Sequence, residues 1–180
     1  MTRILLLLAL LLSVASCTSV DVDRYADQQP AFNLEHFFSQ PVKAWGMFQK
    51  RNGEVAKRFE VNIVSRREGN NLILDERFVY SDGSRQRRVW TLTPEGQGRW
   101  SGHADDVVGV AKGQVAGNTL HWRYRLNLPV GDSTYVMSMD DWMYLMDEDT
   151  LINRTRMSKF GVEVGQVTLF FRRQGVGASQ

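Results

Sequence analysis

Two adjacent carboxylates, Asp140 and Asp141, are the residues of this chain whose type and position most suggest chemistry. They lie in a run of alternating apolar residues, so we expect a β-strand whose two faces each receive one carboxylate. Carboxylates on opposite faces cannot flank one bond, as the catalytic pair of a glycosidase does. One of them must point into the protein, where it needs a partner such as Arg88 or Arg154 on another strand.

The sequence leaves open which of the two carboxylates points inward. If Trp142 and Tyr144 face the interior, Asp140 goes with them, whereas Asp141 points inward if the neighbouring methionines do. Three roles fit an inward carboxylate: an internal ion pair that fixes strand register, a carboxylate–arginine pair that orients the head group of a ligand, and acid–base catalysis.

Other reactive groups are sparse. The glycines at 96–98 are not followed by the Lys-Ser or Lys-Thr of a phosphate loop, and the chain has no Gly-x-Ser-x-Gly nucleophile motif. His103 lies near Asp105 and Asp106 and could form a metal or acid–base group, but a polar turn with no second ligand pair is more often a solvated loop. We therefore predict no catalytic residues, no metal site and no cofactor.

Aromatic residues on different strands form the strongest functional signal. With several methionines near them, they are predicted to line the interior of a barrel, where Met suits an adaptable apolar cavity. A packed core fits the same residues, because side chains can fill a barrel of this size. Together with the two carboxylates and two arginines, the predicted ligand-binding set is Trp90, Trp122, Tyr124, Asp140, Asp141, Trp142, Tyr144, Arg88 and Arg154.

The elements that must position these residues are β-strands. From about residue 41 to 175, hydrophobic residues recur with period two, and turn sequences such as Asn52-Gly53 interrupt them at short intervals. Links this short join antiparallel neighbours. We predict an all-β, antiparallel up-and-down barrel of lipocalin or calycin type with about eight to ten strands, including a short one over 107–111; a sandwich is the alternative.

The N-terminus resembles a targeting sequence. Residues 1–16 combine a positive start, an apolar run and small residues, and so predict a cleaved signal peptide. Cys17 follows, and this arrangement resembles the bacterial lipobox, in which the cysteine receives a lipid anchor. By the same resemblance, Thr18 implies the periplasmic face of the outer membrane. Residues 17–40 then predict a polar tether, ending in phenylalanines near 32–38 that suggest a short helix plugging the domain.

Composition narrows the functional class. The chain has 180 residues, 43% of them hydrophobic, with 22 basic against 20 acidic side chains. This is enough apolar material for one folded domain and too little for two. A nearly neutral chain argues against a partner that is bound by bulk charge, so we expect no nucleic acid.

The chain resembles a known family in several stretches. These are Asp140 to Asp147, Leu151 to Arg154, Met157 to Gly161 and Gly165 to Arg173, with Trp45-Gly46 and Asp75 to Phe78 nearer the start. They are similar to a proteobacterial lipoprotein family catalogued as domain of unknown function 3833. The resemblance implies an anchored, lipocalin-like barrel without an established activity. Members are often encoded beside genes of membrane fatty-acid modification, which associates the family with lipids.

We therefore expect an outer-membrane-anchored lipoprotein that binds a hydrophobic, fatty-acyl or lipid ligand inside its barrel. In this hypothesis, arginine and aspartate at the mouth hold the polar end of the ligand. One alternative is a structural or assembly lipoprotein with a packed barrel and an unknown protein partner. A second is an enzyme acting on modified fatty acids, which a raised carboxylate pKa inside a pocket would favour.

Overall fold

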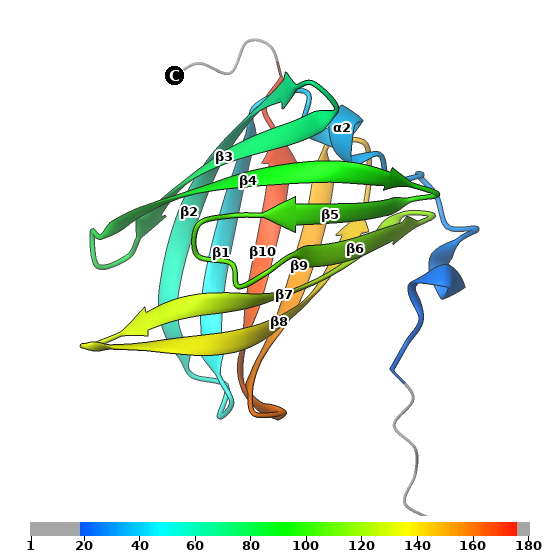
Figure 1. Ribbon diagram of the computed structural model, residues 1–180. Helices are drawn as coiled ribbons and strands as arrows, with labels where there is room; N and C mark the ends of the chain where they lie inside the picture. Colours follow the sequence, from blue (N-terminus) through cyan, green and yellow to red (C-terminus); the bar gives the residue numbers. More distant parts are fainter. Residues whose placement is uncertain (1–18, 176–180) are drawn as a thin grey trace, which may run out of the picture.

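Turn residues divide the chain after Pro41 into ten strands that close into one barrel (Figure 1). The computed structural model describes residues 19–175. This confirms the predicted all-β, up-and-down architecture and its strand number. The strands are β1 (Val42–Lys50), β2 (Val55–Glu68), β3 (Asn71–Tyr80), β4 (Arg85–Gly96), β5 (Arg99–His103), β6 (Ala111–Ala116), β7 (Thr119–Val130), β8 (Ser133–Leu145), β9 (Thr150–Lys159) and β10 (Val162–Arg173).

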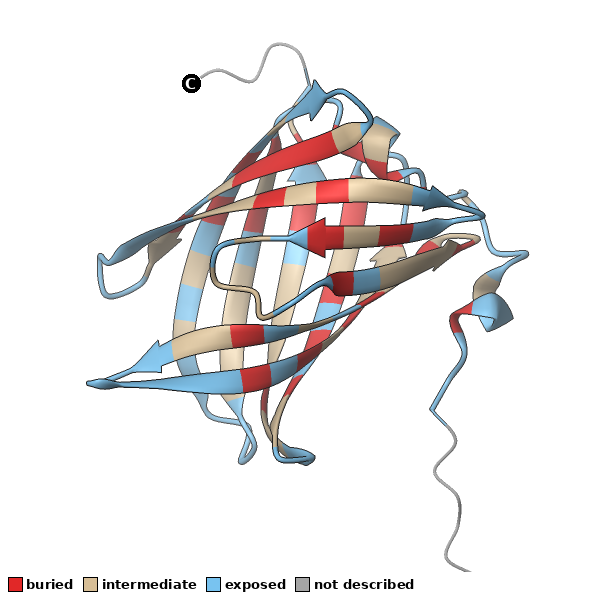
Figure 2. Ribbon diagram, viewed as in Figure 1, coloured by how far each residue is buried: buried red, intermediate tan, exposed pale blue. Residues whose placement is uncertain are grey.

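Each strand pairs in antiparallel fashion with its neighbours in sequence, and β1 closes the barrel against β10, from Val42↔Arg173 to Lys50↔Gly165. The connections therefore alternate between the two ends. One end, which we call the mouth, carries the links at 51–54, 81–84, 104–110, 131–132 and 160–161. Figure 2 shows that the hairpin tips at the mouth are exposed, whereas buried residues concentrate nearer the other end.

A short N-terminal helix, α2 (Leu34–Phe37), plugs the end opposite the mouth (Figure 1). Asn33 caps it, since its side chain accepts a hydrogen bond from the His36 backbone N–H. Leu34 and Phe37 are buried with the barrel core. This agrees with the short plugging helix expected from the sequence. The helix packs there because the end of the barrel removes these apolar side chains from water. Within residues 19–175, no helix is long and apolar enough to cross a membrane.

Residues 19–40 pack against the barrel and are not the free tether that the sequence predicts. The 3-10 helix η1 (Val22–Tyr25) buries Val22, and the Tyr25 ring lies 6.1 Å from that of Trp142 on the outer face of the barrel. The Phe32 backbone N–H donates to the Gly117 carbonyl at 2.8 Å. A few apolar anchors spaced among polar residues explain why composition alone suggested a tether. Residues 1–16, Cys17 and Thr18 lie outside the described part of the chain.

The short strand predicted over 107–111 is displaced. Val107 forms only an isolated bridge with Leu126, and β6 begins at Ala111 and runs to Ala116. The stretch 104–110 is instead a loop, which delivers the Asp106 side chain to Arg88. The contact neutralises the buried charge of Arg88, and this stabilises the loop in its position outside the sheet.

Glycines on β5 and β6 make room for one aromatic ring. Trp122 on β7 lies against Gly102 and Gly113, and a Cβ atom built at either glycine would overlap its indole. The Trp122 ring therefore rests on bare backbone and keeps a fixed place in the wall of the barrel.

We expect Gly113→Ala to lower the free energy of unfolding by about 1–3 kcal/mol, because the added methyl group forces the Trp122 indole to move. Urea unfolding followed by circular dichroism measures this. Gly175→Ala is the matched control, since no atom lies within 4 Å of a Cβ built there. Equal urea midpoints of unfolding for the two variants would contradict the close packing of the Trp122 indole on Gly113.

Candidate ligand-binding cavity

The barrel encloses a cavity of about 690 Å³ between the mouth and the plug. Leu34 and Phe38 of the plug segment contribute to its lining, so the cavity runs the length of the interior. Pockets of this size accommodate drug-sized molecules. The sequence left a packed core and a cavity equally open, and the structure has the cavity.

Apolar and aromatic side chains make most of the wall. They come from nearly every strand, because each strand presents alternate residues to the interior. Trp90 meets Trp122 and Tyr124 edge to face, with ring centroids 5.8 and 5.3 Å apart. Other apolar lining residues are Phe48, Phe59, Val61, Leu74, Phe78, Leu120, Leu126, Met139, Met143, Met157, Val167 and Leu169.

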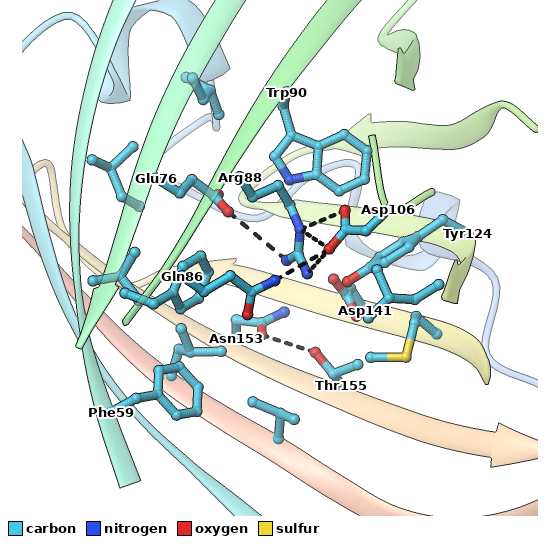
Figure 3. Close-up of a pocket in the computed structure, with 18 of the residues that line it drawn as sticks. Phe59, Glu76, Gln86, Arg88, Trp90, Asp106, Tyr124, Asp141, Asn153 and Thr155 are labelled. Atoms are coloured by element: carbon cyan, nitrogen blue, oxygen red, sulfur yellow. Dashed lines mark hydrogen bonds and ion pairs between the residues drawn. The ribbon is translucent and has the colours of Figure 1, made fainter. Parts of the chain in front are cut away.

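An arginine and its carboxylates occupy one side of the cavity (Figure 3). The Arg88 guanidinium donates to both Asp106 carboxylate oxygens, with Nη2 to Oδ2 at 2.7 Å. Glu76 Oε2 lies 3.9 Å from Arg88 Nη1, and the Gln86 amide donates to Asp106 at 3.4 Å. We call Glu76, Gln86, Arg88 and Asp106 the arginine cluster. Its guanidinium is already held by two acidic residues.

Asp141 lies in the same cavity on β8, with Tyr124, Asn153 and Thr155 beside it (Figure 3). The Thr155 hydroxyl donates to Asn153 Oδ1 at 3.0 Å, and the Asn153 amide donates to the Trp142 carbonyl at 3.4 Å. Asp141 is only 5% exposed, and its Oδ1 has no hydrogen-bond partner among residues 19–175. A buried carboxylate oxygen without a partner is costly, so this atom is free to accept a hydrogen bond from water or from a bound molecule.

Burial changes the acidity of these groups. Burial raises the pKa of Asp141 to about 7, although the Thr155 hydroxyl and the Arg88 charge oppose part of the rise. Burial likewise raises the pKa of Glu76 to about 7 against the attraction of Arg88. The pKa of the Tyr124 hydroxyl is raised well above its usual value, chiefly by burial and then by the Asp141 charge.

Five of the nine predicted ligand-binding residues line the cavity: Trp90, Trp122, Tyr124, Asp141 and Arg88. The question of which carboxylate points inward is answered by Asp141, which pairs in register with Trp122 on the inner face. Arg88 and Asp141 lie inside the barrel, deeper than the position at the mouth that the sequence-based hypothesis gave them.

The other four, Asp140, Trp142, Tyr144 and Arg154, lie on the outer face and do not line the cavity. On β8 the methionines face inward, so the tryptophan and tyrosine that alternate with them face outward. Outside, Trp142 stacks on His121 at 4.0 Å, and His121 contacts Asp140. Arg154 donates to Gln166 on the same outer surface.

Sequence reasoning did not place Glu76, Asn153 or Thr155 in a site, and it considered Asp106 only beside His103, as part of a metal or acid–base group. Glu76 was within reach, since it alternates in phase with Leu74 and Phe78 on β3. Asp106 carried no such signal, because it lies in a loop whose inward turn no periodicity records. Among residues 19–175, no cluster of three or more His, Cys, Asp or Glu side chains could hold a metal ion, and Asp106 pairs with Arg88 and not with His103.

A family model described as "Protein of unknown function (DUF3833)" matches residues 11–173. No curated protein matches the chain in sequence. Several solved structures share the fold, and two of them match most of this chain. An S-type phycobiliprotein lyase, CPES, from Guillardia theta has 7% identity and a TM-score of 0.58, over 79% of this chain and 93% of the lyase.

The second structure is a protein of unknown function from the DUF3598 family of Nostoc punctiforme, with 10% identity and a TM-score of 0.60. The match covers 82% of this chain and 51% of that protein, so the chain spans about half of its length. At these identities the likeness shows the fold alone, and it places the barrel among lipocalin-like architectures.

The raised pKa values predict how stability depends on pH. Between about pH 4 and 7 the folded protein keeps protons on Asp141 and Glu76 that the unfolded chain has lost. We therefore expect the free energy of unfolding to fall as pH rises through this window, by up to about 1.4 kcal/mol per pH unit for each group.

Urea unfolding at a series of pH values between 4 and 8 measures this slope. Asp141→Asn should flatten it, whereas Asp140→Asn on the outer face should change it much less, since the Asp140 charge is a lesser cause of the raised Asp141 pKa than burial. A stability that rises from pH 4 to 7 in the wild-type protein, and stays so in Asp141→Asn, would contradict the buried protonated carboxyls.

Proposed function

The chain belongs to the DUF3833 family, whose description assigns no activity, and we propose that it binds an amphipathic, lipid-like molecule inside its barrel. The observation that carries this proposal is the cavity itself, about 690 Å³ of space with a largely apolar and aromatic lining. Burying an acyl chain there stabilises the complex by roughly 0.8 kcal/mol per methylene group. A purely structural barrel would gain stability by filling this space with side chains.

We further propose that the protein is a lipoprotein, anchored through Cys17 at the periplasmic face of the outer membrane. The lipobox-like sequence ending at Cys17 supports this. Val22 is buried against the barrel, and the five residue steps from position 17 to Val22 span at most about 18 Å. An anchored barrel is therefore held close to the bilayer, with the side formed by β6 and β7, which η1 contacts, nearest to it.

A second candidate function is catalysis on the bound molecule, with Asp141 or Glu76 as acid or base. The raised pKa of both groups, about 7, favours it, because a general acid or base works best near the ambient pH. The two functions differ in what is recovered from the protein. If Asp141 is catalytic, Asp141→Asn should co-purify with a ligand of different mass from that of the wild-type protein; a binder yields the same molecule.

We expect a soluble form beginning at Thr18, secreted into a bacterial periplasm, to co-purify with a lipid-like molecule, seen by native mass spectrometry and lipid extraction. Trp122→Ala should lose most of it, because the indole forms part of the cavity wall. Trp142→Ala is the matched control, since that indole lies outside and should not affect occupancy. A wild-type mass that stays free of ligand after incubation with envelope lipids would overturn the binding function.

A further inference from the structure

The polar part of the cavity points to a particular kind of ligand end. Three carboxyls, those of Glu76, Asp106 and Asp141, line the interior. The guanidinium facing them there is that of Arg88, which donates to both carboxylate oxygens of Asp106 and lies 3.9 Å from Glu76. A ligand carboxylate or phosphate would have to displace Asp106 from Arg88, and it would then meet unpaired carboxyls at close range.

Asp141 supplies what a ligand would bind. Its Oδ1 is a buried acceptor that no group in residues 19–175 satisfies, in a largely apolar wall. A hydrogen-bond donor on the ligand would remove the cost of that orphaned oxygen. The Thr155 and Tyr124 hydroxyls lie close enough to lower the pKa of Asp141, but neither gives Oδ1 a hydrogen bond, and the Thr155 hydroxyl donates to Asn153.

The lining cations other than Arg88 lie nearer the mouth. Among the lining residues, Lys57 follows the β1–β2 hairpin and Arg85 begins β4 after the turn at 81–84. Lys57 is paired with Asp82 at 3.0 Å. An anionic group would therefore stay near Arg85 at the mouth, far from the interior acceptor and without satisfying it.

We propose that the inner end of the ligand carries a hydrogen-bond donor, a hydroxyl or an amine, which binds Asp141, and that the interior rejects a carboxylate or phosphate. This rests on the proposed binding function and names its ligand class. The selectivity comes from the pairing of Arg88 with Asp106, which removes the anion-binding capacity of the arginine, and from the free oxygen of Asp141.

The test uses three probes with one apolar chain: 1-dodecylamine, 1-dodecanol and dodecanoate, each below its critical micelle concentration. Binding to the Thr18-onward protein is measured by isothermal titration calorimetry, at pH 8. We expect the amine and the alcohol each to bind at least tenfold more tightly than dodecanoate. Asp141→Asn should weaken amine binding at least tenfold and change dodecanoate binding less than threefold.

Asp140→Asn is the matched control, because it changes the neighbouring carboxylate on the outer face and should leave all three affinities unchanged. Dodecanoate binding as tightly as the amine would overturn the head-group assignment and leave the binding function standing. Failure of all three chains to bind would overturn both. The wild-type ranking decides the assignment even if Asp141→Asn does not fold.

Discussion

A guanidinium group inside an apolar barrel must be neutralised, and the polar architecture of the cavity depends on how this is achieved for Arg88. The 104–110 loop leaves the sheet and brings Asp106 into bidentate contact with the guanidinium, while Glu76 approaches from the neighbouring strand. The short β5 and β6 and the late start of β6 at Ala111 are the backbone consequences of that detour. The same pairing neutralises the positive charge of Arg88, so the interior beyond the mouth offers a hydrogen-bond acceptor and not a free cation.

The cavity therefore combines two different surfaces. Rings such as Trp90, Trp122 and Tyr124 pack edge to face and give a stiff wall, while the methionines of β8 and β9 supply an adaptable one. Between them Asp141 is held in a dry environment that raises its pKa to about 7. A largely apolar wall with an unsatisfied acceptor at Asp141 is complementary to a molecule with a long apolar body and one polar hydrogen-bond donor.

The sequence predicts the fold better than the site. Period-two alternation and turn residues such as Asn52-Gly53 are local signals, and a meander needs little else, so strand number and closure could be foreseen. The phase of β8 could not, because Trp142 and Tyr144 compete with Met143 and Leu145 for the interior on hydrophobicity alone. Outside the barrel, Trp142 stacks on His121 and meets the Tyr25 ring at a tilt, and these tertiary contacts settle the choice. Asp106 lies in a loop, where no periodicity tells whether a side chain turns inward.

The closure of β1 on β10 carries a consequence for how the chain folds. Every other strand pairing is a hairpin between sequence neighbours, whereas this one joins the first and last strands of the barrel. Hairpins close short loops at low entropic cost, but the β1–β10 pairing must wait until the intervening sheet has curled round. Until then the edges of β1 and of the growing sheet are open to pairing with other chains, which favours aggregation. Pairing of β10, the last strand of the barrel to be synthesised, with β1 removes both edges.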